Sequence, residues 1–451
     1  MNVSFFRELL DTIVDRGRAL TNLTLSSNDS NAEAVDLGRQ LLSRRGESTG
    51  AVLAQRILNA YASLPKEGRL AFFTMLATDL APDVARVLAA AAAYSEEQTP
   101  QRLQQLSASI EPPRQEFFRR LNLAPGGTSA IVGMRADLLD LLKEHPELRP
   151  VDEDIVHLFG SWFNRGFLVL RRIDWSTPAN ILEKIIQYEA VHEIHGWDDL
   201  KRRLDPQDRR CYAFFHPSLI DEPLIFVEVA LVHQIEGSIE DLIRAETAAV
   251  TETPNTAVFY SISNCQKGLA GISFGNFLIK QVVTDLSREI PSLKTFVTLS
   301  PVPGFKAWLD GEREAEASQV IGAAEAETLS LMDQEGWYND TEAVRLLKPL
   351  LCELGAHYFV REKRANGQPL DPVARFHLGN GARLERINWP GDLSPRGLAQ
   401  AAGLMVNYLY DLKDIEKNHE AYAEQGKVVS SSAVTKLART ERSRRSLVPA
   451  S

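Results

Sequence analysis

A strand-to-helix turn in the segment 259–279, FYSISNCQKGLAGISFGNFLI, combines residue types that suit the binding of phosphate groups. Its first half alternates like a β-strand, its second half begins a helix, and Gly268, Gly271 and Gly275 lie around the junction. Glycines let a phosphate approach the backbone closely, and free N–H groups at a helix N-terminus carry partial positive charge. Lys267 adds a cation. The turn predicts a phosphate cradle, but it matches neither the P-loop nor the dinucleotide-binding motif, so a plain tight turn is the competing interpretation.

Serine hydroxyls lie at the ends of both strands that flank this helix. Ser261 and Ser263 end the first strand, and Ser300 ends the second in the stretch TLSPVPGF. A helical crossover makes the two strands parallel, so their carboxyl ends share the sheet edge at which ligands bind. Pro301 and Pro303 stiffen the chain after Ser300. Ser300 is a candidate catalytic residue, although a strand-end serine more often satisfies a backbone group and no GxSxG elbow surrounds it.

His377 is the best candidate proton donor among the nine histidines. We expect it on a strand, ARFHLGN, just before a hairpin turn, where a half-exposed histidine without a chemical role is the alternative. Tyr408 and Tyr410 are expected on the last helix as core aromatics. The stretch from His192 to His195 is one residue short of HExxH and cannot place two metal ligands one helical turn apart, so no metal site is expected.

The composition excludes several classes of protein. The 451 residues carry a formal net charge of −10, which supplies no broad basic field for nucleic acid. Three scattered cysteines without CxxC spacing indicate a reducing compartment and no structural zinc. No apolar run reaches membrane-spanning length, and the N-terminal residues lack the continuous apolar region of a secretory signal. We therefore expect a cytoplasmic protein that binds neither nucleic acid nor membrane.

The hydrophobic periodicity changes along the chain. Residues 1–158 read as helices throughout, with no titratable cluster, and predict a helical domain used in oligomerisation. Residues 159–451 mix strands and helices and predict a catalytic α/β domain whose basic tail, from about residue 428, is mobile. The expected elements of the second part are a strand hairpin over 209–232, a β-α-β unit over 255–300, a second hairpin over 373–389 around Asn380-Gly381, and a helix capped by Ser394.

Five stretches in the same order resemble the malonyl-CoA decarboxylase family: FYSIS, GLAGISFGNFLIKQVV, LSPVPGF, ARFHLGNGARLERINW and RGLAQAAGLMVNYLY. The resemblance is strongest from about Trp197 to Tyr410 and extends more weakly into the helical part. It implies an all-helical N-terminal domain followed by an acetyltransferase-like (GNAT-like) mixed α/β catalytic domain. It also implies that the glycine-rich turn binds the pyrophosphate of coenzyme A through Ala270, Gly271, Ile272, Ser273, Phe274, Gly275 and Asn276.

The resemblance also assigns roles to individual residues. The family's catalytic serine and histidine fall on Ser300 and His377, and its supporting serine and tyrosine fall on Ser261 and Tyr410. Mammalian members have a glutamate where this chain has Ser273, so a contact made by that carboxylate is not expected here.

The implied reaction is the conversion of malonyl-CoA to acetyl-CoA and CO₂ by a homo-oligomer, a dimer or a tetramer, without metal, biotin or another cofactor. In this scheme Ser300 holds the malonyl carboxylate and His377 donates the proton. Two alternatives stay open from the residues: an acyl-CoA-dependent acyltransferase on the same fold, and a non-catalytic acyl-CoA sensor.

Overall fold

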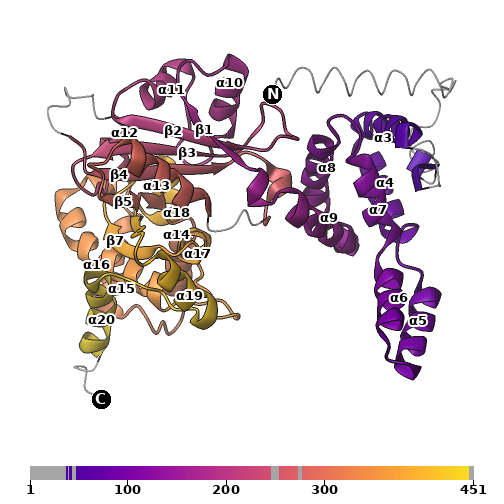
Figure 1. Cartoon of the computed structure of the whole chain (residues 1–451). Helices are drawn as coiled ribbons and strands as arrows, with labels where there is room; N and C mark the ends of the chain where they lie inside the picture. Colours follow the sequence, from indigo (N-terminus) through magenta and orange to yellow (C-terminus); the bar gives the residue numbers. More distant parts are fainter. Residues whose placement is uncertain (1–36, 39, 43–46, 245–252, 273–276, 446–451) are drawn as a thin grey trace. The chain divides into compact units, whose positions relative to one another are not determined.

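The computed structural model describes residues 37–38, 40–42, 47–244, 253–272 and 277–445 (Figure 1). Its contacts divide the chain into two compact units. Unit 1 comprises residues 1–169 with two later segments, 215–222 and 266–273, and unit 2 comprises the remaining residues. The division expected at 158/159 falls inside a helix, and the contacts place it eleven residues later, after Val169.

Unit 1 is helical, as the periodicity predicted. Its core is aromatic: Phe72 and Phe73 of one helix pack against Phe117 and Phe118 of another, and all four side chains are buried. Such rings contribute large apolar contact areas to the stability of a helical domain. The helices are α3 (Glu47–Ala62), α4 (Lys66–Thr78), α5 (Val84–Glu96), α6 (Pro100–Ile110), α7 (Pro113–Leu121), α8 (Gly127–Leu141) and α9 (Arg149–Trp162), with short 3₁₀ turns η1 (Pro146–Leu148) and η2 (Arg165–Phe167).

Part of the glycine-rich turn belongs to unit 1. The 3₁₀ turn η3 (Lys267–Leu269) packs closely on α8, because Gly268 has no side chain there. A Cβ at Gly268 would lie 1.9 Å from the carbonyl oxygen of Val132. Gly268 is therefore required by the packing of η3 on α8, a structural reason that neither the phosphate cradle nor the tight turn had predicted.

Unit 2 is built on a mixed sheet, which confirms the predicted α/β class. The strands are β1 (Val169–Ile173), β2 (Arg209–Phe215), β3 (Pro223–Val232), β4 (Thr256–Asn264), β5 (Thr295–Thr298), β6 (Ser300–Pro301), β7 (Arg383–Asn388) and β8 (Met405–Leu409). The order is β1-β2-β3-β4-β5-β8-β6, with β7 paired to β8. β4 and β5 are parallel, whereas β3–β4, β5–β8, β6–β8 and β7–β8 are antiparallel. One parallel pair at the centre is what the acetyltransferase-like prediction requires.

Helices connect and cover these strands (Figure 1). α13 (Phe277–Glu289) is the crossover between the parallel strands β4 and β5, which confirms the predicted β-α-β unit. The Ser394 hydroxyl accepts a hydrogen bond from Gly397 N and caps α18 (Pro395–Ala401), also as predicted. The other helices are α10 (Ala179–Tyr188), α11 (Trp197–Leu204), α12 (Ile239–Arg244), α14 (Phe305–Glu314), α15 (Ala323–Leu329), α16 (Thr341–Val360), α17 (Pro372–Gly379), α19 (Ile415–Gln425) and α20 (Ser432–Arg445), with 3₁₀ turns η4 (Ser330–Asp333) and η5 (Trp337–Asn339).

The hairpin expected over 373–389 is wrong in its first half. Residues 372–379 form α17, so His377 lies on a helix and not on a strand. The Asp371 side chain accepts a hydrogen bond from Ala374 N, and Pro372 occupies the first helical position. Together these two signals favour a helix start more strongly than the alternation of ARFHL favours a strand. The glycine of the Asn380-Gly381 pair, with φ of +80°, turns the chain from α17 into β7.

Two further expectations differ from the structure at the C-terminal end. The helix capped by Ser394 ends at Ala401, because Ala402 and Gly403 adopt positive φ, and Tyr408 therefore lies on β8. The tail expected to be mobile from about residue 428 contains α20, which packs against α16 and β7. No helix of the described residues is long and apolar enough to cross a membrane.

Candidate active site

Three of the four predicted catalytic side chains meet in one buried hydrogen-bond network in unit 2. Ser300 Oγ lies 3.2 Å from His377 Nε2, and His377 Nδ1 lies 2.7 Å from Tyr410 Oη. Ser300 Oγ also donates to Thr298 Oγ1 at 2.9 Å. The network joins β5, β6, α17 and Tyr410, which directly follows β8, although Thr298 and Tyr410 are 112 residues apart in sequence. The fold thus assembles a serine–histidine–tyrosine chain that sequence spacing could not show.

The electrostatics of the network keep the imidazole neutral. His377 is 3% exposed, and burial lowers its pKa to about 3 because a low-dielectric surrounding disfavours the charged ring. Burial likewise raises the pKa of Tyr410 well above its usual value, so the phenol keeps its proton. Among the described residues the Tyr410 hydroxyl has His377 as its hydrogen-bond partner, so it donates to Nδ1. His377 Nε2 then carries the ring proton and donates it to Ser300 Oγ.

The tyrosine that precedes Tyr410 by two residues orients the imidazole from its face. The Tyr408 and His377 rings are stacked, with centroids 4.5 Å apart and planes inclined by 24°. Thr298 Oγ1 accepts from Tyr408 N at 3.2 Å as well as from Ser300, and so fixes the serine hydroxyl. Thr298 and Tyr408 are both 0% exposed. Sequence reasoning missed their roles, and the i, i+2 spacing from Thr298 to Ser300 is the signal that could have indicated a shared face.

Ser300 and His377 open into a small cavity of about 270 Å³. Apolar side chains supply most of its wall, and they come from β3, β4, α17, the segment after α10 and the stretch of chain between β5 and α14. The lining includes Val191, Phe259, Tyr260, Ile262, Leu299 and Phe376. An apolar lining excludes water and lowers the local dielectric constant. Ser300 and His377 therefore interact more strongly with a ligand charge beside them.

Ser261, the fourth predicted catalytic residue, lies in a different network. Its hydroxyl donates to Glu189 Oε2 at 2.7 Å and lies 3.1 Å from Ser263 Oγ. Neither Ser300 nor His377 is among its hydrogen-bond partners in the described part of the chain. The structure therefore brings together Ser300, His377 and Tyr410, and separates Ser261 from them as a residue that binds Glu189.

The pyrophosphate turn is described in part. Gly271 has φ of +77°, a conformation that favours glycine, and Ala270 and Ile272 flank it. Arg135 Nη1 donates to the carbonyl oxygens of Gly268 and Ala270 at 2.7 and 2.8 Å, so it holds the entry of the turn in place. The predicted residues Ser273, Phe274, Gly275 and Asn276 lie outside the described residues.

The cation expected beside the turn has an ion-pair partner. Lys267 Nζ lies 2.5 Å from Asp140 Oδ2, on an exposed surface of unit 1. The pairing lowers the pKa of the Asp140 carboxyl through the hydrogen bond from Lys267. Lys267 in this arrangement binds α8 and does not stand free for a phosphate.

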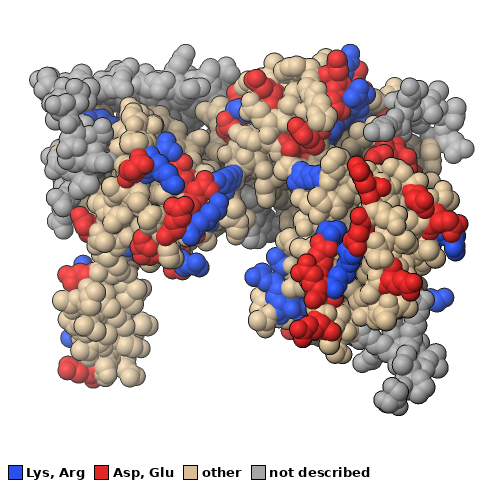
Figure 2. All heavy atoms as spheres, turned by 180° about the vertical axis from the view of Figure 1, so that it is seen from behind, with Lys and Arg blue, Asp and Glu red and all other residues tan. Residues whose placement is uncertain are grey.

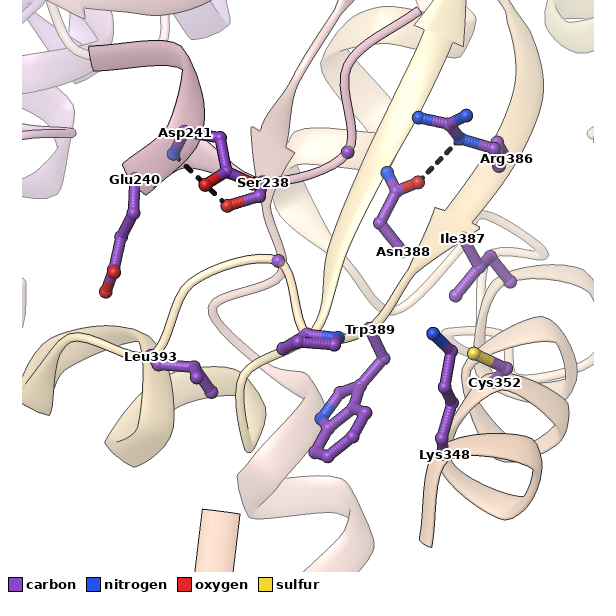
Figure 3. Close-up of a pocket in the computed structure, with 13 residues that line it drawn as sticks. Ser238, Glu240, Asp241, Lys348, Cys352, Arg386, Ile387, Asn388, Trp389 and Leu393 are labelled. Carbon is purple, nitrogen blue, oxygen red and sulfur yellow. Dashed lines mark hydrogen bonds between the residues drawn. The ribbon is translucent and has the colours of Figure 1, made fainter. Parts of the chain in front are cut away.

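A second cavity in unit 2, about 570 Å³, is larger but lacks a catalytic arrangement (Figure 3). Lys348, Arg386 and Asn388 line one side, and Glu240 and Asp241 come from the other. The Arg386 guanidinium donates to Asn388 Oδ1 at 2.6 Å and is thereby engaged within the protein. Charges of both signs and no histidine make this cavity the poorer candidate.

The described residues contain no group of three or more histidine, cysteine or acidic side chains that could hold a metal ion. His195 of the HEIH stretch is exposed, with 76% of its side chain accessible, whereas His192 is partly buried. The two histidines thus do not form a common ligand set.

Fold and site together define an α/β enzyme with a buried serine–histidine–tyrosine network beside a small apolar cavity. Family models described as the malonyl-CoA decarboxylase C-terminal and N-terminal domains match residues 166–448 and 80–163. The chain therefore belongs to the malonyl-CoA decarboxylase family, a family of carboxy-lyases, which confirms the resemblance carried by the five motifs.

Individual relatives agree with this membership. The chain is 39% identical over 339 residues to the mitochondrial malonyl-CoA decarboxylase of Anser anser anser, covering 69% of this chain and 67% of that protein. It resembles the crystal structure of malonyl-CoA decarboxylase from Rhodopseudomonas palustris, with 55% identity and a TM-score of 0.87 over 90% of this chain and 100% of that one. The corresponding structure from Agrobacterium vitis gives 51% identity and a TM-score of 0.86, over 90% and 99%.

Proposed function

We propose that the protein decarboxylates malonyl-CoA to acetyl-CoA and CO₂, with Ser300, His377 and Tyr410 as its reaction centre. The observation that carries the proposal is the continuous hydrogen-bond chain from Tyr410 through His377 to Ser300 at the cavity wall, in a chain of this family. Neither an acyltransferase nor a sensor is favoured by the relatives, which are named as decarboxylases.

The first step breaks the bond between C2 and the malonyl carboxylate. Ser300 holds the carboxylate out of the thioester plane, so that the electron pair of the breaking bond can pass to the thioester carbonyl. CO₂ leaves and an enolate remains. Because the thioester is itself the electron sink, we propose that the reaction needs no metal, biotin or other cofactor.

The second step protonates the enolate. The incoming carboxylate places a negative charge beside the neutral imidazole, which raises the pKa of His377 from its low value in the unliganded protein and favours uptake of one proton from solution. The proton taken up enters at Nδ1, where the Tyr410 hydroxyl turns to accept it, and Nε2 gives its own proton to C2, so the ring ends neutral with its proton on Nδ1. Tyr410 orients the ring throughout. The balance is one malonyl-CoA anion and one proton consumed for one acetyl-CoA and one CO₂.

Coenzyme A is proposed to bind through the turn of residues 270–276. Support comes from Gly271 at positive φ and from the two carbonyl groups that Arg135 holds, because these contacts fix a glycine turn that a phosphate group can approach closely. The N–H groups of Ala270 and Ile272 donate within the turn, to Lys267 O and Leu269 O. Ser273 occupies the position of the mammalian glutamate, so the turn carries no carboxylate there to oppose the pyrophosphate charge.

A homo-oligomer, a dimer or a tetramer, is proposed to assemble through the helices α5 and α6. None of the α5 residues is buried, and four large apolar side chains of this hairpin and its flank are more than half exposed. They are Val84, Leu88, Leu103 and Ile110. Figure 2 shows few charged side chains on the α5–α6 face in view, as expected for a surface covered by another copy.

The three cysteines are free thiols, which supports the proposed cytoplasmic location.

The test is CO₂ release from malonyl-CoA labelled in its free carboxyl group, without any amine acceptor. We expect release by the wild-type chain, and a loss of turnover of roughly 10²–10⁴-fold in His377→Asn, the usual worth of general acid catalysis. His145→Asn is the matched control, because His145 contacts Glu147 in unit 1 and takes no part in the network. Release that requires an amine, or near-normal turnover in His377→Asn, contradicts the proposal.

A further inference from the structure

A short segment without regular secondary structure contributes to the wall of the cavity beside Ser300 and His377, which is called the acyl cavity below. Residues 189–195, called the strap below, connect α10 to α11. Val191 of the strap lines the same cavity as Ser300 and His377. An irregular segment keeps a fixed position beside a cavity only if other contacts hold it, because its backbone N–H and C=O groups are not paired within a helix or sheet.

One buried carboxylate fixes the strap to the central strand β4. Glu189 is 8% exposed, and its Oε1 accepts from Val191 N at 2.7 Å and from His192 N at 2.8 Å. The same carboxylate accepts from Ser261 Oγ at 2.7 Å and from Ser263 Oγ at 3.2 Å. Four donors thus satisfy a buried charge that has no ion-pair partner within the described residues, an arrangement that is costly unless fully hydrogen-bonded.

Two arginines bind backbone carbonyl groups of the strap. Arg396 Nη1 donates to Ala190 O at 2.5 Å, and Arg203 donates to His192 O at 2.8 Å and to Glu193 O at 2.9 Å. These bonds hold the backbone of the strap, and neither arginine is among the residues that line the cavity. The Glu189 carboxylate ties the strap to β4, whose residues Phe259, Tyr260 and Ile262 also line the cavity.

We propose that Glu189 is a positioning residue that sets the width of the acyl cavity at Val191, and that Ser261 acts through it. A carboxylate that binds β4 through two serines and the strap through two backbone N–H groups fixes the distance between these two walls. The inference rests on the proposed function, since it takes the acyl group of a coenzyme A thioester as the occupant. A fixed wall at Val191 excludes a substituent on C2, so Glu189 determines selectivity for unbranched malonyl over C2-methylated malonyl groups.

The experiment measures how well the cavity rejects one added methyl group. The affinities of acetyl-CoA and propionyl-CoA, which differ by one methyl on C2, are compared by isothermal titration for the wild type, Glu189→Gln, Glu189→Ala and Val191→Ala. The affinity ratio does not depend on the fraction of folded protein. We expect Glu189→Ala and Val191→Ala to reduce the preference for acetyl-CoA by roughly fivefold or more, within the range that one methylene group contributes to selectivity.

Glu189→Gln separates the positioning effect of the Glu189 hydrogen bonds from the effect of its negative charge. In Glu189→Gln the amide oxygen still accepts from the two backbone N–H groups, and its NH₂ group donates to a serine oxygen, so we expect the ratio to stay within about twofold of the wild type. Glu193→Ala is the matched control, because Glu193 lies in the same strap with 80% of its side chain exposed. An unchanged ratio in Val191→Ala, or in a folded Glu189→Ala, overturns the inference.

A parallel measurement distinguishes this inference from the proposed function. The kcat/KM ratio for malonyl-CoA and methylmalonyl-CoA should change in the same direction as the affinity ratio. Absence of CO₂ release by the wild type would refute the decarboxylase proposal and leave the affinity test of the strap intact. If Glu189→Ala does not fold, Val191→Ala and Ser263→Ala decide the question by the same ratio, and unchanged values in both reject it.

Discussion

The neutral state of His377 predicts a specific acid sensitivity of the folded protein. An unfolded histidine has a pKa near 6.5, whereas burial lowers that of His377 to about 3. Between these two values the unfolded state binds a proton that the folded state does not bind. The free energy of unfolding therefore falls as the pH falls below 6.5, and the loss is complete only near pH 3.

The magnitude follows from the two pKa values. One pKa unit corresponds to about 1.4 kcal/mol, so the His377 contribution lowers the free energy of unfolding by roughly 1 kcal/mol at pH 5.5 and by more at pH 4.5, relative to neutral pH. At pH 5.5 this figure requires only that the folded pKa lies well below 5.5. Asparagine at position 377 does not titrate, so the free energy of unfolding of His377→Asn should not show this pH-dependent loss.

The assay is urea unfolding of the wild type and His377→Asn at pH 7.5 and pH 5.5. The change in the free energy of unfolding between the two pH values should be roughly 1 kcal/mol larger for the wild type. His192, with a pKa lowered to about 4 by burial, and Asp371, with one raised to about 6 by burial, act in both proteins and cancel in the difference. Equal changes in the two proteins, or an NMR titration showing an imidazolium at His377 near pH 6, would refute the neutral assignment.

Three other changes test the same structural reasoning. Tyr410→Phe leaves His377 Nδ1 without its donor, so turnover should fall by roughly tenfold to a hundredfold while acetyl-CoA affinity stays near the wild-type value, measured by CO₂ release and calorimetry. Gly268→Ala places a Cβ against the carbonyl oxygen of Val132 and should destabilise unit 1 by roughly 1–3 kcal/mol, seen as a lower Tm. Arg203→Met removes the donor to the fully buried Glu228, whose pKa burial raises to about 8, and to the carbonyl groups of His192 and Glu193, and the loss of these buried hydrogen bonds should cost roughly 1–3 kcal/mol in urea unfolding.

Local patterns in the sequence predicted the elements that are fixed locally. The β-α-β unit from β4 to β5 could be read from alternation, glycines and helical periodicity within about 45 residues, and Ser394 before Pro395 identified the start of α18. The hairpin over ARFHLGNG was wrong because two local signals conflict there, and Asp371 with Pro372 decided for a helix. A strand pattern of five residues is too short to outweigh a capped helix start.

The residues of the candidate site divide in the same way. Motifs identified Ser300, His377 and Tyr410 as residue types able to do chemistry, but their distances of 3.2 and 2.7 Å depend on β8 pairing with β5 and β6 and on α17 packing beside them. The sequence by itself determined the helical and α/β parts and the family, and it named the candidate catalytic side chains, because these depend on local periodicity and motif order. Only the tertiary structure decided that His377 is buried and neutral, and that Ser261 binds Glu189, because burial and long-range hydrogen bonds arise from contacts between segments far apart in the chain.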